Sequence, residues 1–387
     1  MQTPYYLIDE DKLSHQLGLM RGAFEKIWPN SIIGYSYKTN SLTWIAEWCK
    51  NQGCFAEVVS EDEYHLGKLI GVEPERFIYN GPVKTRESMC EALRNGCYVN
   101  LDAWREIRWL EDLEPSDRYR LGLRVNFDVE AWCPGHTAYP DGGGRFGFCY
   151  ENGMLKKALD QIAEKGFRVQ GLHLHISSKT RGIAVYEAIA RMACRIKEEY
   201  GLKLSFLDVG GGFFGGMENR PEFPEYLQRI SKILTESFSP EETTLIVEPG
   251  MALVGPSVSY VTSVVDVKDT TYGRFVITDG SRTAVDPTMS KNTYFYRLET
   301  ENRDLHPRQV ICGYTCMEHD RLFIVENKPE LQEHDRIIYD RVGAYTMCLA
   351  PLFIQYYPSV YVRMNGQLRQ VRDRWKPEDI VSKTEIN

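Results

Sequence analysis

Short apolar runs alternate with longer amphipathic segments through the first two thirds of the chain. Eight of these runs are rich in β-branched and aromatic residues and span 31–38, 55–60, 77–79, 98–101, 119–126, 169–176, 204–209 and 244–248. Between most of them, apolar residues recur at helical spacing, in segments 42–52, 61–70, 86–95, 153–165, 185–199 and 224–237. Alternating strands and helices pair in parallel through right-handed crossovers, so eight strands predict an α/β fold with a closed (β/α)8 barrel of the TIM type.

The pattern changes after Gly250. Strand-like runs now follow one another with few helical segments between them, at 257–267, 274–279, 309–312, 321–325, 336–339 and 360–363. This pattern predicts a second, mostly antiparallel β domain. We therefore expect a barrel over residues 24–250 and a β domain over 251–387. The N-terminal segment 1–23, with a strand at Tyr5–Ile8, is expected to join the β domain.

Two further segments stand out from this pattern. Residues 127–147 are rich in Pro, Gly, Tyr and Trp, which is typical of a long functional loop. The residues after about Lys376 are polar and are expected to form a loose tail.

The composition narrows the class of protein. A chain of 387 residues with 43% hydrophobic and 26% charged residues is ordinary for a globular protein of two domains. Its formal net charge of -8 argues against a nucleic-acid partner. We find no window that could span a membrane and no secretory signal at the N-terminus. The ten cysteines are scattered without a CxxC pair, which argues against a zinc site and favours a reducing, cytoplasmic compartment.

Polar residues gather where the predicted barrel strands end, the side on which barrels carry their sites. Lys38 closes the apolar run 31–37. Burial disfavours the ammonium form of a lysine and makes its amine a nucleophile toward carbonyls. The structural alternative is a strand-end lysine that extends its ammonium group into water.

Three other strand ends carry complementary chemistry. Glycines 210–212 let backbone amides approach a phosphate, or else form a tight turn. His173 and His175 share a strand face; metal binding is possible, but further ligands are not evident, and we favour a ring that packs on a flat cofactor. Glu248 ends an apolar strand and needs a partner, either a pyridinium nitrogen or a basic side chain. Together with Lys38, this set describes pyridoxal phosphate.

Short motifs occur in a fixed order along nearly the whole chain: Tyr35-Ser36-Tyr37-Lys38-Thr39-Asn40, Glu57-Val58-Val59-Ser60 with Glu63, Leu123-Arg124-Val125-Asn126, Arg145-Phe146-Gly147, His173-Leu174-His175-Ile176-Ser177-Ser178, Asp208-Val209-Gly210-Gly211-Gly212, Glu248-Pro249-Gly250, Gly313-Tyr314-Thr315-Cys316 and Gly343-Ala344-Tyr345. In this order they resemble the fold-type III PLP-dependent decarboxylases, the family of the diaminopimelate, ornithine and arginine decarboxylases, whose fold is that of alanine racemase.

The resemblance implies roles for these residues. Lys38 holds the cofactor as an imine, His175 stacks on its ring, and Glu248 pairs with the pyridine nitrogen. Further contacts to the cofactor are implied for Glu57, Arg124, Ser178, Gly211, Gly212, Gly250 and Tyr345. The resemblance also implies a homodimer with shared sites, in which Cys316 enters the active site of the neighbouring subunit and reprotonates the α-carbon. Across the same interface, Arg145 pairs with the partner subunit's Asp320.

The chain departs from the family pattern at two positions. Met251 stands where the family usually has a phosphate-binding arginine, so backbone amides or another cation must compensate. Met317 replaces the acid that commonly recognises the distal amine of the substrate, which argues against plain diaminopimelate or ornithine. Arg282, in a segment that often binds the substrate carboxylate, is either a carboxylate clamp or an exposed turn residue.

The activity expected from these residues is α-decarboxylation of a basic or diamino acid, or of a diamino acid conjugated on its side chain. Such an enzyme belongs to the synthesis of polyamines, lysine or siderophores. Two alternatives stay open: an amino-acid racemase of the same fold, which Glu248 disfavours, and a non-catalytic binding protein that resembles a decarboxylase. A single-barrel PLP carrier is disfavoured by the second domain. No metal is expected.

Overall fold

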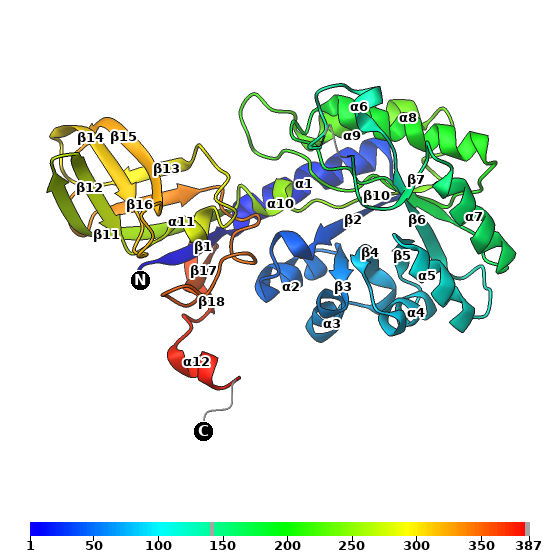
Figure 1. Cartoon of the computed structure of the whole chain (residues 1–387), viewed down its shortest axis with the longest axis horizontal. Helices are drawn as coiled ribbons and strands as arrows, with labels where there is room; N and C mark the ends of the chain where they lie inside the picture. Colours follow the sequence, from blue (N-terminus) through cyan, green and yellow to red (C-terminus); the bar gives the residue numbers. More distant parts are fainter. Residues whose placement is uncertain (140–142, 384–387) are drawn as a thin grey trace. The chain divides into compact units, whose positions relative to one another are not determined.

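The protein comprises two compact units, each with its own sheet (Figure 1). The computed structural model describes residues 1–139 and 143–383. The barrel unit spans Gln16–Ala252, and the β unit combines Met1–His15 with the chain from Leu253 onward.

The barrel confirms the predicted α/β architecture. In the described residues, eight parallel strands form it: β2 (Ser31–Ser36), β3 (Phe55–Ser60), β4 (Phe77–Val83), β5 (Tyr98–Leu101), β6 (Arg120–Asn126), β8 (Gly171–His173), β9 (Phe206–Asp208) and β10 (Thr244–Val247). They are ordered β5-β4-β3-β2-β10-β9-β8-β6, and the pairing of β5 with β6 closes the barrel. The short β7 (Phe148–Cys149) pairs with β6 outside this ring.

Helices connect the strands. Six of them follow the expected amphipathic segments: α2 (Thr43–Asn51), α3 (Glu61–Ile70), α4 (Arg86–Arg94), α7 (Met154–Glu164), α8 (Ile183–Glu199) and α9 (Phe223–Leu234). The short α5 (Trp104–Trp109) was not among these segments. α3 shows how the sequence sets such an element. The Ser60 hydroxyl accepts a hydrogen bond from the Glu63 amide and begins the helix, and Gly71 ends it with a φ of 81°.

A cluster of buried side chains from four strands, Ile78, Tyr98, Phe206 and Ile246, belongs to the barrel core. Gly171 allows this packing, because a Cβ atom there would lie 2.2 Å from the ring of Phe206. In barrels the interior is packed with side chains, so the polar ends of the strands are the part left for chemistry.

The β unit is mostly antiparallel, as predicted. Its strands are β1 (Tyr5–Asp9), β11 (Val258–Thr270), β12 (Gly273–Thr278), β13 (Phe295–Glu299), β14 (Leu305–Cys312), β15 (Arg321–Pro329), β16 (Arg336–Asp340), β17 (Ser359–Met364) and β18 (Gln367–Arg372). The sheet runs β15-β14-β12-β11-β1-β17-β18, with β16 on β11 and β13 on β16. β1 lies between β11 and β17, antiparallel to the first and parallel to the second.

Three helices illustrate where the structure departs from the sequence-based expectation. The long helix α1 (Glu10–Ile27) was not expected, because Gly18 and Gly22 weaken its helical pattern. Part of the expected loose tail forms the short helix α12 (Pro377–Val381). The expected long loop contains the short helix α6 (Val129–Trp132), and its residues 140–142 lie outside the described residues.

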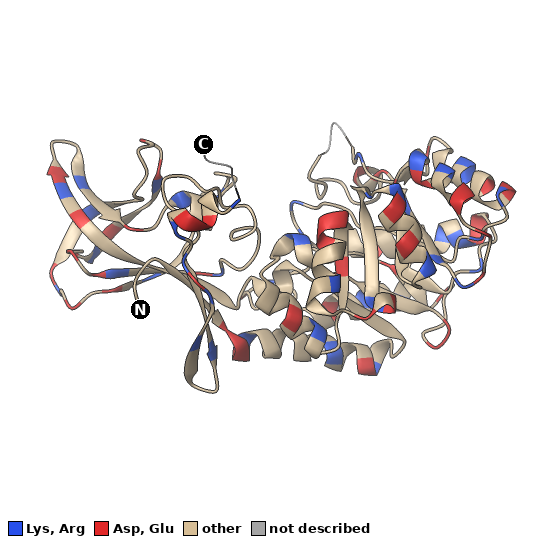
Figure 2. Cartoon of the chain, turned by 90° about the horizontal axis from the view of Figure 1, so that it is seen from below, with Lys and Arg blue, Asp and Glu red and all other residues tan. Residues whose placement is uncertain are grey.

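The surface mixes charges of both signs. Figure 2 shows acidic and basic residues interspersed over the helices of the barrel unit. Among the described residues, no helix combines the length and the apolar character needed to cross a membrane.

Candidate active site

The side chain of Glu57 is the centre of a buried polar network at the carboxyl ends of β2, β3 and β4. Lys38 lies just after β2, in a 3-10 turn, and its Nζ is 2.5 Å from Glu57 Oε2. The Ser36 hydroxyl donates to the same oxygen at 2.6 Å, and Asn80 Nδ2 donates to Oε1 at 3.0 Å. Glu57 is fully buried, whereas the side chain of Lys38 is 34% exposed. The amine is therefore held by an ion pair and is still accessible.

Asn80 links this network to Glu248. Its Nδ2 donates to Glu57 and to Glu248, and its Oδ1 accepts a hydrogen bond from Asn100 at 2.8 Å. Asn80 was not among the residues we expected from the sequence. Its signal is a buried polar residue that follows the apolar run 77–79 in β4.

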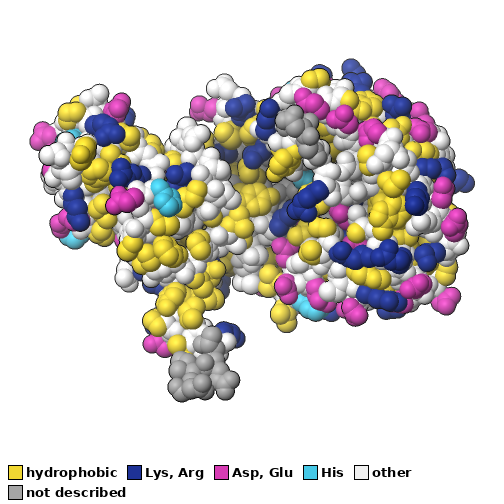
Figure 3. Space-filling view, viewed as in Figure 1, with side chains coloured by type: hydrophobic (Ala, Val, Ile, Leu, Met, Phe, Trp, Pro, Cys, Tyr) yellow, Lys and Arg dark blue, Asp and Glu magenta, His cyan; other side chains and the backbone are white. Residues whose placement is uncertain are grey.

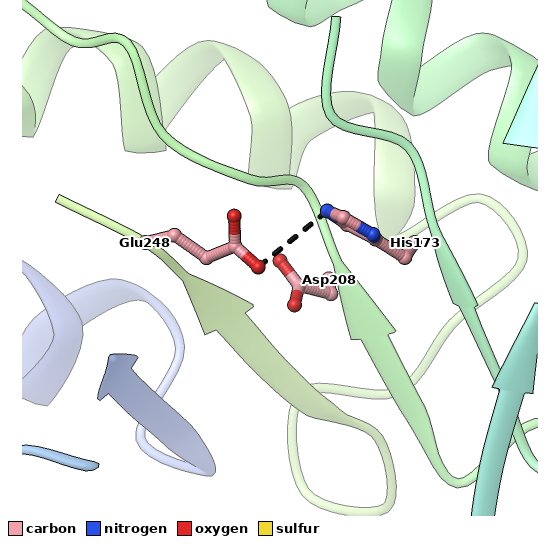
Figure 4. Close-up of side chains that lie close together, drawn as sticks. All are labelled: His173, Asp208 and Glu248. Atoms are coloured by element: carbon pink, nitrogen blue, oxygen red, sulfur yellow. Dashed lines mark ion pairs between the residues drawn. The ribbon is translucent and has the colours of Figure 1, made fainter. Parts of the chain in front are cut away.

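His173, Asp208 and Glu248 form a second buried cluster, shown in Figure 4. His173 Nε2 lies 3.4 Å from Glu248 Oε1. Each of the three residues offers one atom that could bind a metal ion, and these three atoms lie within 4.8 Å of one another. Burial and the negative charge of Glu248 raise the pKa of Asp208 well above its ordinary value. Burial also disfavours the charge of Glu248, but His173, Lys38 and Asp208 outweigh it and lower the pKa of Glu248.

Of the two carboxyl groups, Asp208 is therefore the one that holds a proton more readily. Asp208 Oδ1 accepts a hydrogen bond from the Gly210 amide at 2.8 Å, whereas Oδ2 is buried and has no donor in the part of the chain that the structure describes. A proton on Oδ2 provides a donor for Glu248. The sequence offered no further metal ligand beside His173 and His175. In the structure, His173, Asp208 and Glu248 lie close enough together to hold a metal ion as well.

His175 presents a neutral ring next to this cluster. Burial lowers the pKa of His175 to about 3, and its Nδ1 accepts a hydrogen bond from the Gly211 amide at 3.2 Å. The rings of His173 and His175 are stacked, with centroids 6.3 Å apart. A fixed, uncharged imidazole is suited to pack against a flat ligand.

The glycine turn after β9 is packed too closely for side chains. A Cβ atom on Gly211 would lie 2.1 Å from the carbonyl oxygen of Glu248, and Gly212 has a φ of 92°. Gly250 packs in the same way, because a Cβ atom there would lie 2.0 Å from Thr39 Oγ1. The backbone itself therefore lines this part of the site.

Ser178 and Arg124 shape the loop after β8. The Ser178 hydroxyl accepts hydrogen bonds from the amides of Thr180 and Arg181 and donates to His136. Arg124 Nη1 lies 3.2 Å from Asp102 Oδ2, and its Nη2 donates to the carbonyl of His175 at 3.4 Å. Both side chains are thus engaged with the protein.

The cation of Arg124 also packs on a ring of the long loop. Its guanidinium carbon lies 4.5 Å from the centre of the Phe146 ring, and that of the exposed Arg145 lies 4.1 Å from the same ring.

In the β unit, Asp320 organises the segment that carries Cys316. Its buried carboxylate accepts hydrogen bonds from the Arg282 amide at 2.8 Å and from the Thr315 hydroxyl at 2.6 Å. Cys316 and Tyr345 are exposed, and Met317 is half-buried.

Arg282 is largely engaged within its own unit. Its guanidinium pairs with the buried Asp286 at 3.0 Å and donates to the carbonyls of Met289 and Lys291. These bonds use Nε and Nη2 of the guanidinium group.

A glycine-lined backbone turn, an accessible amine and a buried carboxylate fit an aldehyde-bearing pyridine phosphate. Residues 11–255 match the family described as pyridoxal-dependent decarboxylase, pyridoxal binding domain. A diaminopimelate decarboxylase of Helicobacter pylori (strain J99) is 26% identical over 393 residues, covering 98% of this chain and 95% of the relative.

Solved structures share the fold. Diaminopimelate decarboxylase from M. jannaschii in complex with L-lysine has a TM-score of 0.87 at 21% identity, covering 100% of this chain and 92% of that one. Lysine decarboxylase from Selenomonas ruminantium has a TM-score of 0.76 at 22% identity, covering 98% of this chain and 95% of that one. The family match spans more than half of this chain, and the chain therefore belongs to the PLP-dependent decarboxylases, amino-acid carboxy-lyases that use pyridoxal 5'-phosphate.

Proposed function

We propose that this enzyme decarboxylates a diamino acid with Lys38 as the residue that binds the cofactor covalently. The observation that carries the proposal is the hydrogen-bonded network in which Asn80 joins Glu57, the partner of Lys38, to the buried Glu248. It places an accessible amine and a buried carboxylate in one network.

Each residue then has a task that its environment supports. Lys38 Nζ holds the aldehyde carbon, and Glu57 orients Nζ. Glu248 stays ionised and holds a proton on the pyridine nitrogen, since its pKa is lowered by His173, Lys38 and Asp208 against the effect of burial. His175 packs its neutral ring on the pyridine. Bound pyridoxal phosphate supplies an electron sink for the carbon that loses CO2.

The active unit that we propose is a homodimer with shared sites, in which Cys316 acts as the proton donor in the site of the partner. Support comes from the exposed position of the Cys316 thiol. The β unit also exposes a row of large apolar side chains at Leu349, Leu352, Phe353 and Ile354, which is typical of an interface. Figure 3 shows hydrophobic side chains gathered on the surface of this unit.

The proposed pairing of Arg145 with the partner subunit's Asp320 is the weakest part of this interface. Asp320 is buried and already accepts hydrogen bonds from Arg282 and Thr315 in its own chain. An incoming arginine would therefore share an occupied carboxylate, whereas Arg145 itself is exposed over Phe146.

For the substrate we propose a diamino acid whose distal end differs from that of the relatives' substrate. The relatives are named diaminopimelate decarboxylases, which supports an acid of this size. Met317 offers no carboxylate for a distal amine, which favours a neutral, acylated or conjugated end. We also propose a cytoplasmic location, because all ten cysteines are free thiols.

The test is CO2 release by the PLP-loaded protein. The panel contains meso-diaminopimelate, L- and D-lysine, ornithine, arginine, and N-acyl or citryl conjugates of diamino acids. We expect one member to be turned over, with a loss of at least about 1,000-fold in kcat for Lys38→Ala. Cys316→Ala is expected to lower kcat while cofactor binding is unchanged.

Two results would reject parts of the proposal. Racemisation of a substrate without CO2 release would favour the racemase alternative. A Lys38→Ala protein that still becomes labelled by cofactor and borohydride would reject the covalent role of Lys38.

A further inference from the structure

The cofactor carries a phosphate dianion, and a dianion in a backbone-lined site is strongly stabilised by a nearby cation. At the position after Gly250 the chain has Met251, whose thioether carries no charge. The structure places the guanidinium of Arg181 against this side chain, with Nη1 in contact with Met251 Sδ. The cation of Arg181, from the loop after β8, thus lies next to residue 251.

The protein holds Arg181 firmly in this position. Its amide donates to the Ser178 hydroxyl at 3.0 Å, and its carbonyl accepts a hydrogen bond from the hydroxyl of Tyr226 in α9 at 2.6 Å. Its φ of 50° lies in the left-handed region, which is uncommon for a residue with a long side chain. Such backbone strain is found at ligand clamps among other functional positions.

Arg181 has no acidic partner among the described residues. In the part of the chain that the structure describes, no carboxylate lies within ion-pair distance of Arg181, whereas Lys38 pairs with Glu57 and Arg124 with Asp102. Its other contacts are a weakly accepting sulfur and the ring of Phe214, whose centre is 5.5 Å from the guanidinium carbon.

These contacts bring together the loops after β8, β9 and β10. Arg181 belongs to the first loop, Phe214 follows the glycine turn of the second by two residues, and Met251 ends the third. β9 and β10 are the seventh and eighth strands of the barrel in chain order, and the loops after these strands are where barrels often bind phosphate. Tyr186 strengthens this arrangement by donating to the Gly211 carbonyl at 2.9 Å.

We propose that Arg181 is the cation that binds the cofactor phosphate, and that it replaces in function an arginine at position 251. The proposal extends the proposed site, in which Lys38 and Glu248 hold the other end of the same molecule. It explains how a chain with methionine at position 251 can bind a dianion next to a glycine turn.

The test compares two ligands of the apoprotein, pyridoxal 5'-phosphate and pyridoxal, which share the ring and aldehyde but differ in the phosphate. Dissociation constants are measured by absorbance titration and equilibrium dialysis. We expect Arg181→Met to weaken binding of the phosphorylated ligand by about 30- to 100-fold and binding of pyridoxal by less than about threefold. An equal loss for both ligands would mean that the variant damages the Lys38 end of the site.

A swap of the two side chains gives the sharper test. The double variant Arg181→Met/Met251→Arg exchanges the two side chains that are in contact, so that position 251 now supplies the cation. We expect this double variant to recover phosphate selectivity to within about fivefold of the wild type, because the charge is restored near the same place. Arg195→Met, an exposed arginine of α8 paired with Glu199, is the matched control and should leave both dissociation constants unchanged.

Arg220 is the rival cation, because its guanidinium carbon lies 5.2 Å from the centre of the same Phe214 ring. Loss of phosphate selectivity in Arg220→Met with none in Arg181→Met would overturn the proposal in favour of Arg220. If Arg181→Met does not fold, as judged by circular dichroism, Arg181→Lys replaces it. Lysine keeps the charge but loses the bidentate geometry, so we then expect a loss of about tenfold in phosphate selectivity. Unchanged selectivity in the folded variant rejects Arg181.

Discussion

The residues of the site depend on a few buried acids whose charge is set by their neighbours. Glu63, a half-buried acid, interacts with one of them, Glu57. Burial raises the pKa of Glu63 to about 7, the charge of Glu57 adds to this rise, and the hydrogen bond from the Val59 amide partly opposes it. The unfolded chain releases this proton near pH 4.5, whereas the folded protein keeps it until about pH 7. The free energy of unfolding therefore decreases as the pH rises between these values.

Glu63→Gln removes this pH dependence and keeps an acceptor for the Val59 amide. We expect the variant and the wild type to be equally stable at pH 5 or below. At pH 8 the variant should be more stable by about 2 kcal/mol, less than the full linkage value because the side chain is partly exposed. Urea unfolding at several pH values measures this difference. A difference that does not change with pH would contradict the raised pKa.

Asn80 is expected to be sensitive to a change of one atom. Asn80→Asp replaces the amide that donates to Glu57 and Glu248 by a third carboxylate of the same shape. The buried acids would then face a like charge, and we expect the free energy of unfolding at pH 8 to fall by about 2–4 kcal/mol. The loss should be smaller at pH 5. Asn100→Asp changes a neighbouring amide that, among the described residues, donates to Asn80 and to neither glutamate, and it serves as the control.

A candidate site residue could be predicted from the sequence where its position at the end of a single strand already marks it. Lys38 and Glu248 each stand out as charged residues that close an apolar run. Asn80 and Arg181 do not, because their importance comes from side chains on other strands and loops. Their partners are more than 20 residues away, at Glu57 and Met251, and only the closed barrel brings them together.

At the scale of elements, the glycine turn after β9 is the part most tightly fixed by packing. Gly211→Ala would place a Cβ atom against the backbone carbonyl of Glu248, which cannot move without displacing the end of β10. We expect a loss of stability of about 2–3 kcal/mol and weaker cofactor binding.

Gly18→Ala makes the same chemical change in α1, where no atom lies within 4 Å of the added Cβ. Alanine favours a helix interior over glycine, so we expect a gain of about 0.5–1 kcal/mol. Thermal unfolding of the two variants should therefore shift in opposite directions. Shifts of the same sign would show that the turn can adjust to a side chain.

The elements themselves were largely predictable. β3, β5 and α3 have the bounds that the sequence pattern indicates, because the periodicity of strand and helix is clear in these segments. β13 and β18 were not predicted. β18 consists mostly of exposed residues with glutamine and arginine, so it lacks the alternation of a half-buried strand.

At the scale of the whole molecule, the proposed shared sites can be tested by mixing two inactive proteins. Lys38→Ala and Cys316→Ala homodimers are unfolded together and refolded as a mixture. If Lys38 and Cys316 of one site come from different subunits, each heterodimer has one intact site, and activity should recover to about one quarter of the wild-type value. No recovery, with heterodimers shown by mass spectrometry, would place both residues in one subunit or remove Cys316 from the site.

The position of β1 inside the sheet of the β unit has a consequence for synthesis. Tyr5 pairs with Val261 on one side and Ser359 on the other, so β1 leaves the ribosome long before its partner strand β17. The barrel unit ends at Ala252 and can be completed while β17 is still unmade. A chain that stops before β17 leaves an open edge on β1, ready to pair with another chain. Closure of this sheet around β1 therefore requires that the chain has been translated through β17.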